Sequence, residues 1–400
     1  MNYDFESLIN RKKLGSSKWL GMIDKKPDVS ENVVPFSVAD MEFKNAPEIM
    51  EGLKTYLDET ILGYTSPTNE YLDAVVNFMK RQHDWSINKE WIVPAPGVVP
   101  ALAHAIRGFT EPGDGVIIMS PVYYPFFSCV EMNHRVIVEN PLINNGEKYE
   151  IDFDDLEIKA SNPKNKILLF CSPHNPVGRV WKKEELIRLV DICLKHDVLI
   201  ISDEIHFDLI MPGYKHTVLA TISEEIENRC IVCTAPSKTF NLAGMQTSNL
   251  IIKNENLRNK MKQVMLEVAF MSCGTLGYKA CELAYTHCDK WLDELILKID
   301  ENRNIVEEFC KKYIPEIKVY PLEGTYLQWL DLRSFGLSKE QLEKEMIQEC
   351  ELFFDEGYIF GEAAEGFERI NIACPTDILL EGLNRLLKWA QRHRKERSGV

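Results

Sequence analysis

The chain has 400 residues, of which 45% are hydrophobic and 27% are charged, and its formal net charge at pH 7 is -15. This length exceeds the roughly 250–300 residues at which a single hydrophobic core stops growing, so the sequence predicts two folded lobes. The acidic balance disfavours nucleic acid as a partner, because phosphate backbones are bound by clustered lysine and arginine side chains.

Two further properties concern the cellular compartment. No apolar run approaches the roughly 18 residues that a membrane span needs, and the first residues show neither the basic nor the apolar region of a secretion signal. The eleven cysteines are too sparse for a disulfide scaffold. We therefore expect a cytoplasmic protein that is not embedded in a membrane.

The N-terminal part of the chain shows little regular pattern. The first 45 residues are mixed in character and are expected to be loop-like. The segment from Gly63 to Pro67 is a turn-rich break between two helical stretches.

Residues 94–99 read Pro-Ala-Pro-Gly-Val-Val and open a helical pattern. The backbone N–H groups at Gly97 and Val98 are then expected at a helix N-terminus, where they favour an anion such as a phosphate. On this stretch alone, a plain Pro-Gly turn explains the residues equally well.

From Gly115 onward the sequence repeats a strand, loop and helix pattern that is typical of a mostly parallel α/β sheet. The strands are expected at residues 116–119, 167–170, 198–201 and 230–234. Tyr124, Asn175, Asp203 and Lys238 each lie just beyond the C-terminal end of one of these runs. In an open parallel sheet those ends share one edge, where ligands bind. The sequence therefore predicts a site at this edge.

Lys238 follows a buried strand and is flanked by small and hydroxyl residues. Burial disfavours the charged ammonium and lowers the pKa of a lysine, so the neutral amine can attack an aldehyde and hold it as a Schiff base. Taken alone, the Ser-Lys pair is a weak signal, because such pairs are common and a solvated lysine is the more frequent outcome.

After Tyr285 the pattern changes. A long amphipathic helix is expected over residues 290–313, strands near residues 324–330 and 367–372, and a closing helix over residues 377–394. Ser338 and Gln341 form an S-x-x-Q capping box at the start of another helix. We expect this part of the chain to form a second, smaller lobe.

A lysine that forms an imine, a buried aspartate and a phosphate-binding helix terminus on one sheet edge suit pyridoxal 5'-phosphate (PLP), a cofactor that acts as an electron sink. A buried carboxylate at Asp203 would keep the pyridine nitrogen protonated by charge pairing. Neither glycine-rich nucleotide motif occurs, and the nine histidines are scattered without ligand spacing, so we expect no nicotinamide cofactor and no metal ion.

The motifs around these residues also resemble a family. Asn175 in His-Asn-Pro-x-Gly, Asp203 in Asp-Glu-Ile-His and Lys238 in Ser-Lys-Thr-Phe-Asn resemble the fold-type I enzymes of the class I/II aminotransferase superfamily, over nearly the whole chain. The resemblance implies the PLP-dependent transferase fold. In that fold, residues 46–285 would form a large PLP-binding domain with a mostly parallel central sheet flanked by helices. Residues 1–45 and 286–400 would form a smaller α+β domain.

Within the superfamily, the segment from Val38 to Phe43, the Gly63-Tyr64 pair and His206 resemble the MalY/PatB type of cystathionine β-lyase; many aminotransferases have tyrosine in place of His206. This resemblance implies PLP-dependent β-elimination of a small sulfur amino acid, cystathionine or a cysteine S-conjugate, giving pyruvate, ammonia and a thiol. An aminotransferase that uses the same lysine is the alternative. A regulatory or binding protein that keeps the fold is a third interpretation.

The resemblance also implies roles for individual residues. Lys238 would be the Schiff-base lysine and the acid/base that moves the α-proton, with Tyr64 and Tyr124 as further catalytic residues. Asp203 would pair with the pyridine nitrogen, and Tyr124 would stack on the ring. The other residues expected at the cofactor are Gly97, Val98, Val99, Asn175, His206 and Ser237.

Tyr64 is expected to come from the other subunit of a homodimer, so that each active site is shared. Arg369, in Phe-x-Arg-Ile-Asn, would grip the substrate α-carboxylate with its planar two-donor fork. Asn175 and Ala39 are also expected at the substrate. Taken alone, an arginine on an edge strand is more often a surface ion pair.

One position departs from the pattern of the family. Ala235 stands where many relatives have a phosphate-binding serine. Either Thr234 or Ser237 compensates, or the phosphate is held by fewer donors.

Overall fold

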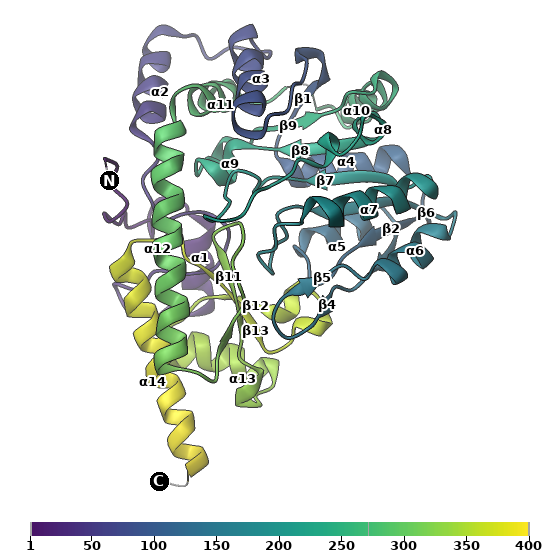
Figure 1. Ribbon diagram of the computed structural model, residues 1–400. Helices are drawn as coiled ribbons and strands as arrows, with labels where there is room; N and C mark the ends of the chain where they lie inside the picture. The colour runs from purple at the N-terminus through teal and green to yellow at the C-terminus, as the bar shows by residue number, and fades with distance from the viewer. Residues whose placement is uncertain (1, 271, 399–400) are drawn as a thin grey trace.

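The computed structural model describes residues 2–270 and 272–398, and two β-sheets organise the chain (Figure 1). The larger sheet has seven strands in the order β1-β9-β8-β7-β6-β2-β3. These strands are β1 (Ile92–Ala95), β2 (Gly115–Ile118), β3 (Val136–Glu139), β6 (Asn165–Cys171), β7 (Leu199–Asp203), β8 (Cys230–Thr234) and β9 (Ser248–Ile251). Strand β9 is antiparallel to β1 and β8, and the other adjacent pairs are parallel. The expected α/β fold with a mostly parallel central sheet is therefore confirmed.

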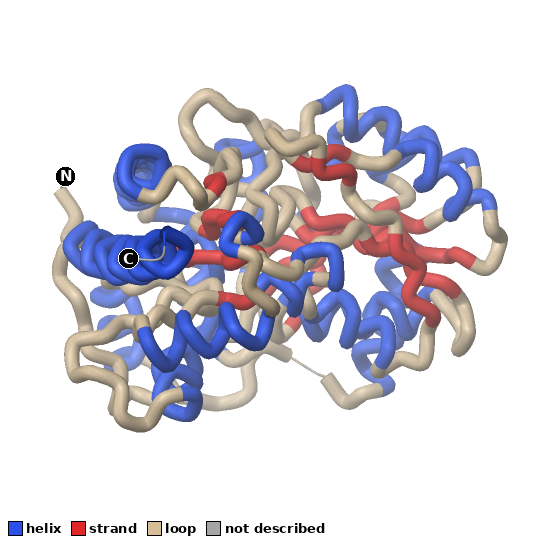
Figure 2. The backbone as a smooth tube through the Cα atoms, turned by 90° about the horizontal axis from the view of Figure 1, so that it is seen from below, coloured by secondary structure: helices blue, strands red, loops and turns tan. Residues whose placement is uncertain are grey.

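Helices cover both faces of this sheet, and the strands lie between them in both views (Figures 1 and 2). One face carries α4 (Val98–Phe109), α5 (Pro125–Glu131) and α10 (Glu255–Glu267), and the other carries α6 (Phe153–Ser161) and α7 (Lys183–Lys195). Successive residues of a strand point to opposite faces, so Val116 and Ile118 pack in one core and Ile117 in the other. Burial on both faces explains why strands β2, β6, β7 and β8 contain unbroken apolar runs in the sequence.

Three further helices lie beside the β1 end of the large sheet, at the top of Figure 1. They are α2 (Pro47–Glu59), α3 (Asn69–His83) and α11 (Thr275–His287). The loop between α2 and α3 contains the expected turn-rich break, and the side chain of Thr68 caps α3 by accepting a hydrogen bond from the backbone N–H of Tyr71 at 3.2 Å.

The second sheet is antiparallel and has four strands in the order β10-β11-β13-β12. They are β10 (Lys318–Val319), β11 (Leu327–Asp331), β12 (Asp355–Glu356) and β13 (Phe367–Asn371), accompanied by α13 (Lys339–Lys344) and α14 (Thr376–Ser398). Helix α12 (Asp289–Tyr313) packs against α11 at one end and α14 at the other, and thus spans both parts of the molecule (Figure 1). The expected long helix is confirmed, as is the capping box that Ser338 and Gln341 form at the start of α13.

The first 45 residues differ from the expectation of a loop, because they contain α1 (Ser17–Lys25). Trp19 and Met22 on this helix are buried against Ile347 and Phe353. The helix has only nine residues, and isolated helices shorter than about 12–15 residues are marginal. Its stability therefore comes from tertiary packing, which the local sequence pattern does not reveal.

A short hairpin of β4 (Ile143–Asn144) and β5 (Tyr149–Glu150) and the short helices α8 (Glu224–Glu227) and α9 (Pro236–Thr239) complete the regular structure used below. The division into residues 46–285 and residues 1–45 with 286–400 stays a prediction. The strands of the large sheet lie between Ile92 and Ile251, and those of the second sheet lie between Lys318 and Asn371.

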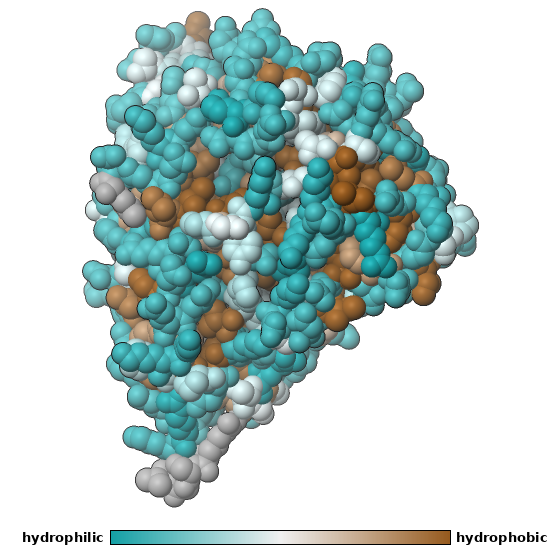
Figure 3. Space-filling model, viewed as in Figure 1, coloured by the Kyte–Doolittle hydropathy of each residue, from teal (hydrophilic) through white to brown (hydrophobic). Residues whose placement is uncertain are grey.

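The surface reflects the high content of charged residues. The face in Figure 3 is mostly hydrophilic, with apolar patches between the polar side chains. None of the helices formed by the described residues combines the length and the apolar character that crossing a bilayer demands.

Candidate active site

A cavity of about 170 Å³ lies at the edge where the parallel strands of the large sheet end. Strands β1, β6, β7 and β8 each lead into a segment that lines it. Of the residues that the sequence analysis selected, the cavity is lined by Ala39, Gly97, Val98, Val99, Asn175, Asp203, His206, Ser237 and Lys238. The structure thus brings these nine together, from segments as far apart in the sequence as Ala39 and Lys238.

Gly97 lies at the N-cap of α4, directly after β1. Its φ of 126° is a conformation that other residues adopt only with strain, which explains why glycine is needed here. The N-terminus of α4 therefore opens onto the cavity at Gly97, Val98 and Val99. Its free N–H groups and the helix dipole form a suitable site for a phosphate.

Lys238 lies on α9, immediately after β8. Its Nζ donates a hydrogen bond to the carbonyl oxygen of Ala39 at 2.7 Å. Burial is the main cause that lowers the pKa of Lys238 to about 8, and it outweighs the opposite effect of Asp40. An appreciable fraction of the lysine is therefore a neutral amine near neutral pH.

Asp203 is the last residue of β7 and is 3% exposed. Burial raises the pKa of its carboxyl group to about 7, although the backbone N–H of Ile205 donates to Oδ1 at 3.2 Å. A carboxylate that is costly to ionise alone favours a cationic partner, because charge pairing offsets the loss of water. A protonated ring nitrogen is a partner of this kind.

His206 is buried, and its Nδ1 has no hydrogen-bond partner among the described residues. Burial holds the pKa of its imidazole well below the usual value, so the ring is neutral. An orphaned polar atom in a cavity wall fits a ligand with a polar group at this point.

The structure places Tyr124 and its neighbour Tyr123 differently. The cavity is lined by Tyr123, whereas Tyr124 is 44% exposed and packs near Phe360, with ring centroids 6.1 Å apart. Tyr124 is the N-cap of α5, and this turn directs the two neighbouring side chains differently. The sequence did not reveal which of the two tyrosines faces the cavity. The stacking role expected for Tyr124 stays a prediction, and Tyr123 is a second candidate for it.

Arg369 and Tyr64 lie outside the cavity lining. Arg369, on β13, is 1% exposed and donates from Nη1 to Asn175 Oδ1 at 2.7 Å, so it lies directly behind a lining residue. Interpreting it as a surface ion pair is therefore wrong.

Tyr64 is fully exposed in the loop between α2 and α3, and its expected position at the partner's cavity stays a prediction.

The structure also shows where the two hydroxyl residues near Ala235, Thr234 and Ser237, lie. Thr234 is buried in β8, and its hydroxyl group donates to the carbonyl oxygen of Asn249 at 3.3 Å. Ser237, by contrast, lines the cavity. Binding of a phosphate by Ser237, or by fewer donors than in relatives, stays a prediction.

Among the lining residues that the sequence analysis did not select, Ala243, Gln246 and Thr247 form one group. They lie in the connection that turns back into the antiparallel strand β9. The left-handed φ of 46° at Gln246 marks this turn, but no apolar pattern or family motif pointed to it. The reversal of the chain at β9 brings these residues to the cavity.

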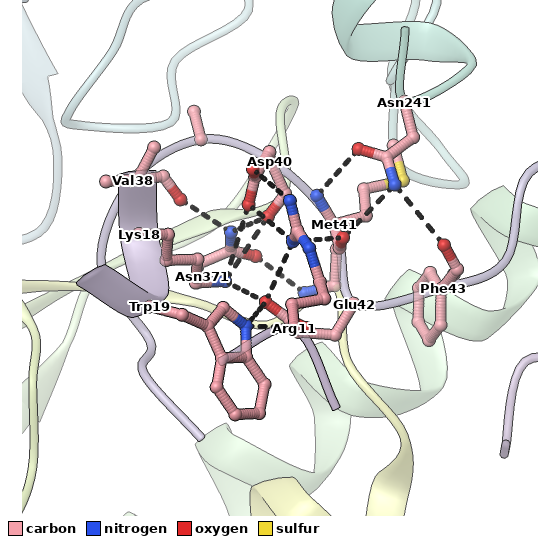
Figure 4. A network of polar contacts seen from close by, with 12 residues as sticks. Arg11, Lys18, Trp19, Val38, Asp40, Met41, Glu42, Phe43, Asn241 and Asn371 are labelled. Carbon is pink, nitrogen blue, oxygen red and sulfur yellow. Dashed lines mark hydrogen bonds and ion pairs between the residues drawn. The ribbon is translucent and has the colours of Figure 1, made fainter. Parts of the chain in front are cut away.

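Residues 38–43, here named the 38–43 segment, carry Ala39 to the cavity and are held by two asparagines (Figure 4). Asn371, at the end of β13, donates from Nδ2 to the carbonyl oxygens of residues 38 and 40, both at 2.7 Å. Asn241 accepts from the N–H of Met41 at 3.0 Å and donates to its carbonyl oxygen at 3.1 Å. The second sheet, through Asn371, and the loop after α9, through Asn241, therefore both contribute to fixing this segment.

Charged side chains near α1 hold the same segment (Figure 4). Lys18 Nζ lies 3.0 Å from Glu42 Oε1, and both side chains are 1% exposed. Arg11 Nη2 lies 2.9 Å from Asp40 Oδ2, and Trp19 Nε1 donates to Glu42 at 3.2 Å. The ion pairs thus join the N-terminal helix to the wall of the cavity.

The lining residues fit PLP, the cofactor that the sequence predicts. A lysine with a lowered pKa can take the aldehyde, a buried carboxyl group can pair with the ring nitrogen, and the N-terminus of α4 with Ser237 can take the phosphate. Within the described part of the chain, no group of three or more histidine, cysteine, aspartate or glutamate side chains is arranged to hold a metal ion.

Comparison with known proteins identifies the family. The sequence model for aminotransferase class I and II matches residues 31–386. The chain belongs to this family. The expected superfamily, the resemblance to the MalY/PatB type and the PLP-dependent transferase fold are confirmed.

Several known proteins are similar to this chain over most of their length. Cystathionine beta-lyase PatB of Bacillus subtilis (strain 168) is 41% identical over 355 residues, covering 89% of this chain and 92% of the relative. The crystal structure of cystalysin from Treponema denticola, which contains PLP, has a TM-score of 0.96 at 54% identity and covers 98% of this chain and 99% of its own. A PLP-bound C-S lyase from Staphylococcus hominis, complexed with the inhibitor L-cycloserine, has a TM-score of 0.90 at 32% identity and covers 98% of both chains.

Proposed function

We propose that the chain is a PLP-dependent carbon-sulfur β-lyase. It cleaves a sulfur amino acid, cystathionine or a cysteine S-conjugate, to pyruvate, ammonia and a thiol. The observation that carries the proposal is that Lys238, with a pKa lowered to about 8, and Asp203, with a raised pKa, line one cavity. The similarity to a cystathionine beta-lyase and to a C-S lyase supports this choice within the family.

PLP would be held by groups at several points of the cavity. The N-terminus of α4 and Ser237 suit its phosphate, Asp203 its ring nitrogen, Tyr123 its ring and Lys238 its aldehyde. When bound, PLP supplies an electron sink that stabilises the negative charge left when a substrate loses its α-proton.

Lys238 is the proposed base. Its pKa of about 8 leaves part of the amine neutral near pH 7, so Nζ can take up the proton from the substrate Cα. The carbonyl oxygen of Ala39, 2.7 Å from Nζ, accepts a hydrogen bond from the ammonium that results. The same ammonium can then donate a proton to the departing thiolate.

Arg369 is proposed to bind the substrate α-carboxylate together with Asn175. Its guanidinium is buried, and Nε has no partner among the described residues, so donors remain for a ligand. A buried, charge-assisted pair excludes water and fixes the amino acid in one orientation.

A homodimer with shared active sites is also proposed. Ile61 is 93% exposed, Leu62 65%, and Tyr64 is fully exposed, which is unusual for three apolar side chains in one loop. A second copy of the chain would cover this loop and receive Tyr64 at its cavity.

Replacement of Ile61 by glutamate tests the dimer. We expect Ile61→Glu to elute as a monomer in size-exclusion chromatography and to lose activity. The matched control is Ile158→Glu on α6, where the side chain is 67% exposed but lies elsewhere on the chain. A dimer that persists in Ile61→Glu contradicts the proposed interface.

The reaction is tested by incubating the purified enzyme with PLP and L-cystathionine, without any 2-oxo acid. Sustained release of pyruvate and free thiol is expected, and Lys238→Ala should abolish it. No release, together with a single loss of the cofactor colour that a 2-oxo acid restores, would instead identify an aminotransferase. Pyruvate release by Lys238→Ala at a rate comparable to the wild type would eliminate Lys238 as the base.

A cytoplasmic location is supported by the state of the cysteines. All eleven are free thiols in the structure, and ten of them are buried. Free buried thiols are typical of a reducing compartment. Fractionation of the producing cells should recover the activity with the cytoplasm, and recovery outside the cell would contradict this location.

A further inference from the structure

Asp355 lies beside the candidate carboxylate-binding residue and was not selected from the sequence. It is on β12, directly opposite Arg369 on the antiparallel strand β13. Its Oδ2 accepts a hydrogen bond from Arg369 Nη2 at 2.5 Å and another from the backbone N–H of Val38 at 2.9 Å. The residue is 8% exposed, so both bonds lie away from bulk water.

The register of the sheet fixes this pair. Side chains directly opposite each other on antiparallel strands lie on the same face, with Cβ atoms about 4.5–5.5 Å apart. Asp355 therefore reaches Arg369 without any movement of the backbone. The register thus holds this carboxylate beside the guanidinium.

Two further contacts complete the support of the guanidinium. The ring of Phe360 lies 4.7 Å from the guanidinium carbon of Arg369, and Asn175 accepts a hydrogen bond from Nη1 at 2.7 Å. Asp355 supplies the only counter-charge that forms an ion pair with Arg369 among the described residues. With Nη1 and Nη2 each engaged once, the plane of the guanidinium is set before a substrate arrives.

The second hydrogen bond of Asp355 reaches the 38–43 segment. Val38 has a φ of 57°, an unfavourable conformation for a β-branched residue, so this turn depends on external contacts. The next residue, Ala39, accepts hydrogen bonds from Lys238 Nζ at 2.7 Å and from the hydroxyl group of Tyr326 at 2.8 Å. One carboxylate oxygen thus connects the candidate substrate arginine to the turn that carries the acceptor for the candidate base.

We propose that Asp355 is a positioning residue of the active site, which sets the orientation of Arg369 for the substrate α-carboxylate and holds the turn at Val38. This inference rests on the proposed function, in which Arg369 binds that carboxylate. Asp355 touches neither substrate nor cofactor in this role.

The test compares three substitutions in the PLP-loaded enzyme. Asp355→Ala removes both hydrogen bonds and should raise KM for L-cystathionine at least tenfold, with kcat changed by less than about threefold. Asp355→Asn retains an amide oxygen that can accept from both donors, and should raise KM by less than about threefold. Asp355→Glu keeps the charge but moves it by one methylene, and should resemble the alanine variant.

The control is Asp331→Ala. Asp331 forms an ion pair in the same sheet, with Oδ2 2.7 Å from Arg333 Nη2, but among the described residues neither partner hydrogen-bonds to a residue of the cavity lining or of the 38–43 segment. Its KM should equal that of the wild type. An unchanged KM in Asp355→Ala, or equal increases in the alanine and asparagine variants, would overturn the proposal. If Asp355→Ala does not fold, the asparagine and glutamate variants are compared instead. A larger increase of KM in Asp355→Glu than in Asp355→Asn supports the proposal, and equal increases overturn it.

A binding measurement separates this proposal from the proposed reaction. L-Alanine has no leaving group at Cβ, and its binding can be followed by the change in cofactor absorption. Its apparent Kd should rise in the order wild type, Asp355→Asn, Asp355→Ala. If the wild type binds L-alanine but releases no pyruvate from cystathionine, the lyase proposal fails while the order of Kd values still tests Asp355. Equal Kd values in all three proteins refute the positioning role.

Discussion

Replacement of Asp203 by asparagine tests two properties of this carboxylate. The first is the effect of its burial on the free energy of unfolding, and the second is its contribution to PLP binding. Burial raises the pKa of Asp203 to about 7, from 3.8 in an unfolded chain. A difference of about 3 units corresponds to roughly 4 kcal/mol. The folded chain without cofactor holds the proton more tightly than the unfolded chain. The associated stability is therefore complete below pH 3.8 and is lost as the pH rises through about 7.

Asparagine cannot ionise, yet its amide oxygen can still accept the hydrogen bond from the N–H of Ile205. The extra N–H donors of the amide cost the same free energy at every pH, so the informative quantity is the change between two pH values. We expect the free energy of unfolding of Asp203→Asn apoprotein, relative to wild type, to increase by up to about 4 kcal/mol between about pH 4 and pH 8. The same variant should bind PLP more weakly, because the ring nitrogen loses its negative partner.

The assay is urea denaturation of the two apoproteins at about pH 4, 6 and 8, with the affinity for PLP measured by titration. Asp84→Asn serves as the control: its exposed carboxylate has a pKa lowered by Lys80, so its removal should give no gain at high pH. A relative stability of Asp203→Asn that does not change with pH would refute the reasoning that burial raises the pKa of Asp203.

Two further predictions concern Lys238 and the N-terminal ion pairs. The rate at which PLP loads the apoprotein should rise with pH up to about 8, because the neutral fraction of Lys238 increases through its pKa; a rate that is constant from about pH 6 to pH 9 contradicts the lowered pKa. Lys18→Met should lower the free energy of unfolding by about 3 kcal/mol in urea denaturation, because Glu42 loses a buried partner while Arg11 remains 3.3 Å away. The exposed Lys54→Met should cost less than about 1 kcal/mol, and equal losses in the two variants would contradict the role of burial.

Much of the site is determined by short stretches of sequence. Asp203 and Lys238 follow apolar runs that form β7 and β8. Because parallel strands end at one edge, their place at a common site follows from local pattern alone. The helix start at Gly97 and the capping box at Ser338 could be predicted for the same reason, because each depends on residues only a few positions apart.

Other features depend on how distant segments meet. Ala39 contacts Lys238, which is 199 residues away in the sequence, through a segment that is held by β13 and by the loop after α9. Asp355 faces Arg369 only because β12 and β13 pair in one particular register. The orientation of a turn decided between Tyr123 and Tyr124, and the antiparallel return through β9 brought Gln246 to the cavity.

The physical reason for this division is the range of the interactions. Hydrophobic periodicity, caps and strand ends are properties of a few neighbouring residues. The sequence by itself therefore determined four parallel strands of the large sheet, β2, β6, β7 and β8, their common binding edge, and Lys238 and Asp203 as candidates. Strand register, side-chain direction after a turn and the packing of a nine-residue helix such as α1 depend on contacts between distant segments. Only the tertiary structure decided which aromatic ring faces the cavity, what holds Arg369 in place, and which carbonyl group receives the amine of Lys238.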